Sequence, residues 1–165
     1  MKQTIKIILL SINLVALATI AANAQTVDFS GTWKVNKETS DPGGLSINSI
    51  PIELVIQQDK NQLVIARTST NVKAEIKKDR EVLKTDGSVS SHSLADSTTK
   101  KSVAKWNEDH KTLAETATYT DTNGKEVKAV KKTWAVLADG KTLHISVAMT
   151  VDGEDYTLEE YFDKQ

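Results

Sequence analysis

The sequence predicts an all-β fold, an antiparallel up-and-down meander closed into a barrel of eight to ten strands. Apolar and polar side chains alternate over most of the chain after residue 28, and glycine-containing turn dipeptides separate the alternating segments at regular spacing. No segment after residue 24 shows the 3.6-residue period of an amphipathic helix. A long meander with one apolar face protects its edges by closing into a barrel, and a twisted sandwich is the alternative.

The N-terminal residues 1–24 are interpreted as a cleaved Sec-type signal peptide. Lys2 and Lys6 precede an apolar run over 7–20, and Ala22-Asn-Ala24 fits the small-x-small cleavage pattern. The run is shorter than the roughly 20 residues that a membrane-spanning helix needs, and a retained N-terminal anchor is the alternative. The mature chain, 25–165, is expected to be one domain without a membrane span, located in the periplasm or secreted.

Composition excludes several classes of function. The 21 Lys and Arg residues nearly balance the 22 Asp and Glu residues, so nothing favours a nucleic-acid partner. The chain has no Cys, which excludes disulfides and a thioether lipid anchor. The three His residues never approach metal-ligand spacing, so neither a metal nor a cofactor is expected.

The first strand is predicted at 29–35, where Phe29, Gly31 and Trp33 share one face. A Gly two residues before a Trp suits the closed end of a barrel, because the backbone must bend there and a large ring can fill the end. The polar segment 36–51 contains Pro and two adjacent Gly residues. It is predicted to be a long loop that acts as a lid or a mobile flap.

Hairpins account for the remainder of the chain. A hairpin over 52–67 turns at Lys60-Asn61, and 70–98 is interpreted as two short, weakly specified strands. Four strands are predicted at 112–121, 126–138, 141–151 and 154–163, joined by two-residue type I′ turns at Asn123-Gly124, Asp139-Gly140 and Asp152-Gly153. These turns fix registers that place large apolar residues on one face: Leu113 with Trp134, Ala117 with Val130, Trp134 with Ile145, Val130 with Met149, Met149 with Tyr156, and Leu143 with Phe162.

The run Phe29-Ser-Gly-Thr-Trp-Lys-Val35, followed by a β-meander, resembles the calycin barrels, which include the lipocalins and the fatty-acid-binding proteins. With Asp28 it is also similar to the start of secreted bacterial lipocalin-like proteins. The resemblance implies a lipocalin-like barrel of eight or ten strands with an internal cavity for a small apolar or amphipathic molecule. It also implies that Gly31 and Trp33 form a structural plug at the closed end and do not contact ligand.

Charged residues fall on the inward face of the predicted barrel. In the registers above, Glu115 lies opposite Lys132, Glu160 lies diagonal to Lys132, and Arg67 lies opposite Leu54. Inward charges are unfavourable unless they are paired or hydrated, so these four residues are a candidate anchor for a polar ligand group. The alternatives are a position at the barrel rim or a satisfied internal ion network. Tyr119 and Tyr156 could line the same pocket or belong to the core.

The function that the sequence favours is an exported soluble β-barrel that binds or carries a small apolar or amphipathic ligand. The alternative is a non-catalytic protein-interaction module, an inhibitor or an accessory subunit with a filled barrel. Catalysis is not expected. The run 88–93 contains hydroxyls and a His but no nucleophile elbow. Lys132 would keep Glu115 and Glu160 ionised, which removes the general acid of a glycosidase.

Overall fold

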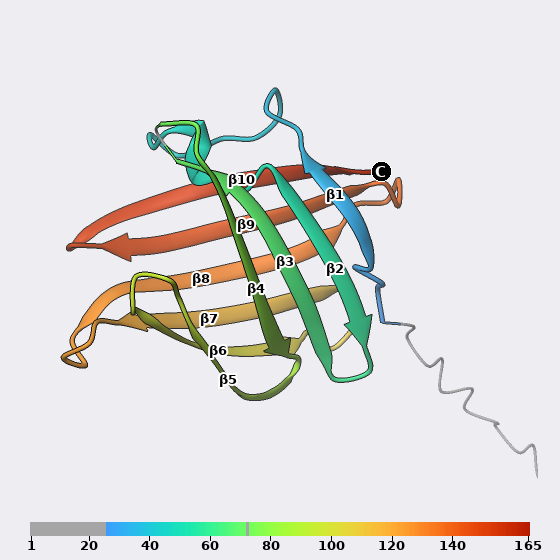
Figure 1. Cartoon of the computed structure of the whole chain (residues 1–165). Coiled ribbons are helices and arrows are strands. Elements are labelled where there is room, and N and C mark those ends of the chain that lie inside the picture. The colour runs from blue at the N-terminus through green and yellow to red at the C-terminus, as the bar shows by residue number, and fades with distance from the viewer. Residues whose placement is uncertain (1–25, 72) are drawn as a thin grey trace, which may run out of the picture.

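The computed structural model describes residues 26–71 and 73–165, so the predicted signal peptide lies outside the described residues. It contains a single turn of 3₁₀-helix, η1 (Ile47–Ser49), and otherwise strands (Figure 1). The ten strands are β1 (Gly31–Val35), β2 (Glu53–Asp59), β3 (Gln62–Thr70), β4 (Ile76–Lys84), β5 (Asp86–Ser93), β6 (Thr99–Trp106), β7 (Thr112–Thr120), β8 (Glu126–Val136), β9 (Thr142–Val151) and β10 (Glu154–Lys164). In this part of the chain no helix is long and apolar enough to cross a membrane.

The strands form one antiparallel sheet that curls into a nearly closed barrel, which confirms the predicted fold class. The order is β4-β3-β2-β1-β10-β9-β8-β7-β6-β5, so that β1 joins the start of the meander to its end. β4 and β5 share no ladder of backbone hydrogen bonds and leave a gap in the wall. A side chain bridges this gap near the β4–β5 turn, where the Lys84 amide donates to Ser90 Oγ at 2.8 Å.

The predicted registers of β7 to β10 are confirmed, including Leu113 opposite Trp134 and Met149 opposite Tyr156. The predicted turn type is correct only at Asp152-Gly153, where both residues have positive φ. The other two connections are wider than two residues. Asp139 Oδ1, for example, accepts hydrogen bonds from the amides of Lys141 and Thr142. The pairing survives because Leu137 donates to the Thr142 carbonyl at 2.8 Å.

The segment 70–98 differs from the sequence prediction. It forms two full strands of nine and eight residues, β4 and β5, in place of two short ones. Ile65 pairs with Glu81 and Arg67 pairs with Asp79, so that β3 fixes the position of β4. The inner face of β4 carries acidic residues toward the barrel interior, and for this reason the sequence lacks the expected apolar alternation.

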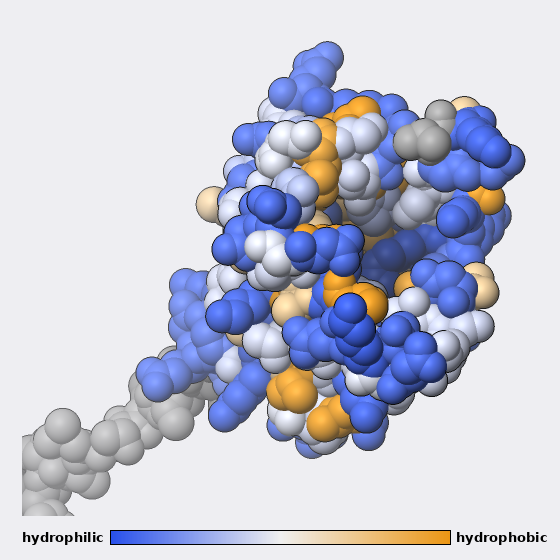
Figure 2. Space-filling model, turned by 90° about the vertical axis from the view of Figure 1, so that its left-hand side faces the viewer, coloured by the Kyte–Doolittle hydropathy of each residue, from blue (hydrophilic) through white to orange (hydrophobic). Residues whose placement is uncertain are grey.

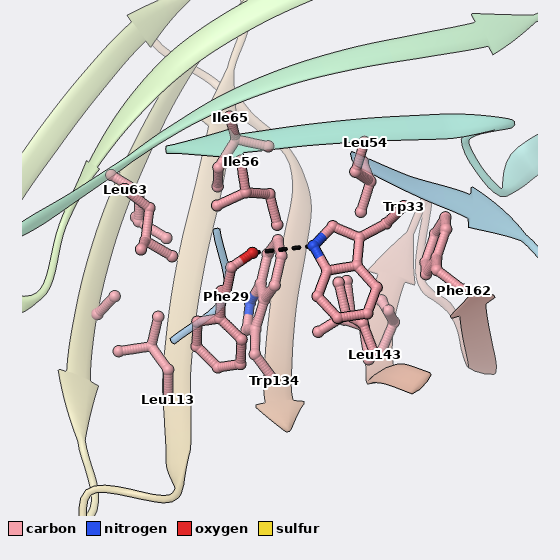
Figure 3. Packing of buried hydrophobic residues seen from close by; sticks show 14 of the residues in the cluster. Phe29, Trp33, Leu54, Ile56, Leu63, Ile65, Leu113, Trp134, Leu143 and Phe162 are labelled. Carbon is pink, nitrogen blue, oxygen red and sulfur yellow. Dashed lines mark hydrogen bonds between the residues drawn. The ribbon is translucent and has the colours of Figure 1, made fainter. Parts of the chain in front are cut away.

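The apolar core fills one end of the barrel (Figure 3). Trp33 is fully buried there, and its Nε1 donates to the Phe29 carbonyl at 2.9 Å. The Phe29 ring stacks on Trp106 with a centroid separation of 5.3 Å and lies tilted against Trp134. Gly31 has a φ of +138°, and an added Cβ would lie 3.1 Å from Lys164 Cε. The backbone therefore passes close to the C-terminal strand at this end.

The long loop 36–50 is attached to β10 and then crosses to β2. Asp41 and Glu159 exchange backbone hydrogen bonds of 2.8 and 2.9 Å. Gly43, with a φ of +61°, lies so close to β10 that a Cβ would sit 1.8 Å from the Thr157 carbonyl oxygen. The second half of the loop carries the buried Ile50. The segment thus covers the end of the barrel opposite the aromatic core, which is formed by Phe29, Trp33, Trp106 and Trp134.

Candidate ligand cavity

A cavity of about 290 Å³ occupies the barrel interior between the aromatic core and the loops of the open end. Figure 2 looks onto this end and shows a hollow with hydrophilic residues in its depth. Part of the wall is apolar, with Val130 and Met149 among its residues. Most of the lining is polar or charged: Ser49, Arg67, Ser69, Lys77, Asp79, Glu81, His92, Lys100, Lys128, Lys132 and Glu160. The cavity therefore differs from a uniformly apolar pocket.

A chain of ion pairs crosses the barrel at the base of this cavity. Arg67 on β3 forms an ion pair with Glu81 on β4. Lys100 Nζ on β6 lies 2.9 Å from Glu81 Oε2 and 2.8 Å from Glu115 Oε1. Glu115 on β7 also accepts a hydrogen bond of 3.1 Å from Trp134 Nε1. The chain thus ends on the aromatic core, and each of its carboxylates has a cationic partner.

The charges in this chain hold one another in the ionised state. Burial alone would raise the pKa of Glu81, but Arg67 and Lys100 outweigh this effect and lower the pKa from 4.5 to about 2. Burial likewise opposes ionisation of Glu115, yet Lys100 and then Lys132 lower the pKa of that carboxyl. The same attraction raises the pKa of Lys100 against the effect of its burial. The network is therefore internally compensated at neutral pH.

A second group of charges lacks this compensation. Glu160 on β10 is only 5% exposed and lines the cavity, yet its carboxylate makes no hydrogen bond or ion pair within the described residues. Burial raises the pKa of Glu160, and the attraction of Lys132 does not offset that effect. Burial also lowers the pKa of Lys132 and of Lys128. The Lys132 ammonium lies 5.7 Å from the Trp134 ring centroid and has no carboxylate within 4.0 Å among those residues.

The gap between β4 and β5 is bridged at its open end by His92. Its Nε2 lies 2.8 Å from Asp79 Oδ1, and Arg67 Nη1 lies 3.8 Å from Asp79 Oδ2. These side chains line the cavity from the side of the gap. In the part of the chain that the structure describes, no three His, Asp or Glu residues are arranged to hold a metal ion.

The structure brings together most of the residues that the sequence singled out. Arg67, Lys132, Glu160 and Tyr119 line the cavity. Glu115 lies opposite Lys132 in the ladder, as the register predicts, but its ion pair is with Lys100 and it does not line the cavity. Tyr156 packs against the core and belongs to the lining of a different hollow.

Sequence reasoning did not identify five residues of the cavity with charged side chains: Lys77, Asp79, Glu81, Lys100 and Lys128. Two of them carried a usable signal. Lys100 continues the inward alternation of Ser102 and Ala104, and Lys128 continues that of Val130 and Lys132. Nothing comparable marks Asp79 and Glu81. Charged residues occupy the inward positions 77, 79 and 81, the outward positions include the apolar Ile76 and Val82, and the ion-pair partners lie on three other strands, β3, β5 and β6.

A larger hollow of about 650 Å³ lies against the outer side of β6 to β10. Outward-facing residues such as Thr116, Ala129, Lys131, Ala148 and Thr150 line much of it. Volume alone would favour this hollow. The interior cavity is nevertheless the stronger candidate site, because buried charged side chains converge only there.

Comparison with known proteins identifies the fold. No family model matches the chain, and neither does any curated protein. Among solved structures, the chain is similar to zebrafish ileal bile acid-binding protein complexed with cholic acid, with a TM-score of 0.51 and 10% sequence identity. The match covers 83% of this chain and 98% of that protein. Together with the ten-stranded, nearly closed meander, it shows that the chain shares the β-barrel fold of that protein, which is the fold that the resemblance implies.

Proposed function

We propose that this protein binds or carries a small amphipathic molecule inside its barrel. The observation that carries the proposal is the interior cavity, where a wall containing Val130, Val147 and Met149 faces the side chains of Lys128, Lys132 and Glu160, which form no ion pair with the described residues. An amphipathic molecule would cover the apolar wall and hydrogen-bond to the charges, so both surfaces would gain from its presence. The fold supports the proposal, because the similar zebrafish structure is complexed with cholic acid.

Binding without catalysis is the activity that we infer. Glu81 and Glu115 are ionised and held by cations, so neither can donate a proton to a substrate at neutral pH. Among the described residues, no hydroxyl of the run 88–93 forms a hydrogen bond with His92, whose Nε2 lies 2.8 Å from Asp79 Oδ1, so the run forms no Ser–His pair. A binding site requires neither group.

We also propose that the protein is exported and acts in the periplasm or outside the cell. This rests on the signal-peptide pattern of residues 1–24 and on the absence of Cys, which would leave a soluble product after cleavage. Mass spectrometry of the protein isolated from its host tests this, because cleavage after Ala24 predicts an N-terminus at Gln25.

A protein-interaction module with a filled barrel is the second candidate function. Its distinguishing feature would be an interior packed to the density of an ordinary core. The cavity of about 290 Å³ favours the ligand-binding proposal over this alternative.

Native mass spectrometry of the protein purified from its own host tests the proposed function. We expect excess mass that disappears on denaturation, with a matching compound in a solvent extract of the same sample. Lys132→Met should retain less of this compound, and Lys131→Met, which changes an exposed neighbour on the opposite face, should retain as much as the wild type. A bare protein that also fails to raise the fluorescence of an apolar dye would contradict the proposal.

A further inference from the structure

Glu160 is the feature of the cavity that a simple fatty acid would not explain. The residue is 5% exposed and lines the cavity, and its carboxylate receives no hydrogen bond from the described residues. Because no fully buried side-chain oxygen among those residues lacks a partner, the carboxylate oxygens face the open space of the cavity. A carboxylate taken out of water is strongly destabilising unless it receives hydrogen bonds. The tail of a fatty acid offers none. The missing donor must therefore come from water or from the ligand itself.

Lys132 and Lys128 on β8 form a positively charged part of the cavity lining, in contrast to the negatively charged Glu160 on β10. Both line the cavity, and neither has a carboxylate within 4.0 Å in the described part of the chain. Lys128 lies four residues before Lys132 on the same inward face, with its ammonium 5.3 Å from the Tyr119 ring centroid. Two cations on the same inward face, neither of them paired within the described residues, favour an anionic group of the ligand.

The two ends are separated by a distance that one small molecule can span. Lys132 pairs with Val147 on β9, which pairs with Leu158 on β10, and Glu160 lies two residues farther along that strand. Two strand spacings of about 4.8 Å, combined with an offset of two residues of about 3.3 Å each, place the backbones of Lys132 and Glu160 roughly 12 Å apart. The cavity of about 290 Å³ has room for roughly ten groups of the size of water. A small molecule with polar groups at both ends fits these dimensions.

We infer that the ligand of this cavity carries an anionic group for Lys132 and Lys128 and, at its other end, a hydrogen-bond donor for Glu160. The inference rests on the proposed function and names its ligand class: a short zwitterion or a hydroxy acid. The donor is an ammonium in the first case and a hydroxyl in the second. The apolar middle of such a molecule lies against Val130, Val147 and Met149. Specificity arises because a ligand without the donor leaves Glu160 unpaired.

Isothermal titration calorimetry with four eight-carbon probes tests the inference. Octanoate carries only the anion, octylamine only the donor, and 8-aminooctanoate and 8-hydroxyoctanoate carry both. We expect at least one of the two probes with both groups, the double-headed probes, to bind wild-type protein about tenfold or more tightly than octanoate. The reason is that such a probe can donate a hydrogen bond to the buried Glu160 carboxylate, which octanoate cannot do. The better of the two distinguishes a zwitterion from a hydroxy acid. This comparison requires no variant.

Three variants then test which protein residue binds each end of the ligand. Glu160→Gln should reduce the preference for the double-headed probe over octanoate to near unity. Lys132→Met should weaken octanoate and the double-headed probes alike. Glu159→Gln alters the adjacent, outward carboxylate, which lies 2.5 Å from His144 Nε2, and should change neither value.

The possible failures are distinguishable. Octanoate binding as tightly as both double-headed probes would overturn the inference and leave the proposed function standing. A preference that persists in Glu160→Gln would overturn the role of Glu160 in the same way. If all four probes fail to bind while host-purified protein carries a ligand, the inference alone is wrong. If the host-purified protein is also empty, the proposed function fails.

Discussion

Removal of the Lys100 ammonium should destabilise the fold strongly, because this group holds two buried carboxylates. Its Nζ lies 2.9 Å from Glu81 and 2.8 Å from Glu115. In Lys100→Met, Glu81 keeps the ion pair with Arg67. Glu115, which is 1% exposed, loses the only cation within 4.0 Å of it among the described residues. We expect the larger part of the loss to come from Glu115.

The magnitude follows from the burial of this charge. Removing one partner of a buried ion pair costs about 3–5 kcal/mol, because the remaining charge stays in the interior without compensation. A domain of this size has a free energy of unfolding of roughly 5–15 kcal/mol, so Lys100→Met should still fold. Adding Glu115→Gln removes the stranded charge and keeps an oxygen for Trp134 Nε1, which lies 3.1 Å from Glu115 Oε2. The double variant should therefore recover roughly half of the loss.

Urea unfolding at pH 7, followed by tryptophan fluorescence, measures these differences. Lys101→Met is the matched control, because Lys101 is the exposed, outward neighbour on β6, and its change should stay within about 0.5 kcal/mol. A double variant no more stable than Lys100→Met would refute the reasoning, since the stranded Glu115 carboxylate would then not be the source of the loss.

The remaining predictions concern pH, the binding site and the loop cover. Because the pKa of Glu81 is lowered from 4.5 to about 2, its ionised form stabilises the fold above pH 4.5. About 3 kcal/mol of the free energy of unfolding should be lost as the pH falls from 4.5 to 2. Urea unfolding across this range should show a smaller loss of stability in Glu81→Gln than in the wild type. Glu160→Gln should raise the free energy of unfolding at pH 7 by about 1 kcal/mol or more, because it removes an uncompensated buried charge. This gain should shrink in acid, because burial raises the pKa of the Glu160 carboxyl and the folded wild type then takes up a proton there. A loss of stability in Glu160→Gln would mean that Glu160 has a partner within the protein. Gly43→Ala should displace the loop from β10, because the Cβ of the alanine would sit 1.8 Å from the Thr157 carbonyl oxygen. Hydrogen exchange at the Asp41 and Glu159 amides should therefore accelerate. Unchanged exchange rates at these two amides would contradict the close packing of loop and strand.

The strands β7 to β10 could be predicted because most of their inward-facing residues are apolar and pack into the core. A register shift of one residue would have exposed Trp134 and Leu143, so the correct pairing was strongly specified. The same pairing predicts Lys132 and Glu160 on the inner face, where the structure has them. Turn geometry was less predictable, because carboxylates such as Asp121 bind the amides of Asn123 and Lys125 and widen the connection.

The other half of the site could not be predicted from local pattern. β4 has apolar and charged residues mixed on its outer face and an inner face that carries Asp79 and Glu81, so its alternation gives no consistent hydrophobic signal. Glu81 is stable inside the barrel only because Arg67 and Lys100 approach it from β3 and β6. Sequence spacing does not reveal that three-strand arrangement. The sequence therefore suggested an ion cluster of Glu115, Lys132 and Glu160. In the structure, Glu115 belongs to the compensated chain, and the other two form no ion pair within 26–71 and 73–165.

A crystal structure of the protein with its bound ligand, purified from the host or loaded with 8-aminooctanoate, tests the central claim most directly. The account predicts electron density inside the barrel, with the anionic group at Lys132 and Lys128 and the donor within hydrogen-bond distance of Glu160. Density in the outer hollow, beside Thr116 and Ala148, with only water between Lys132 and Glu160, would contradict it.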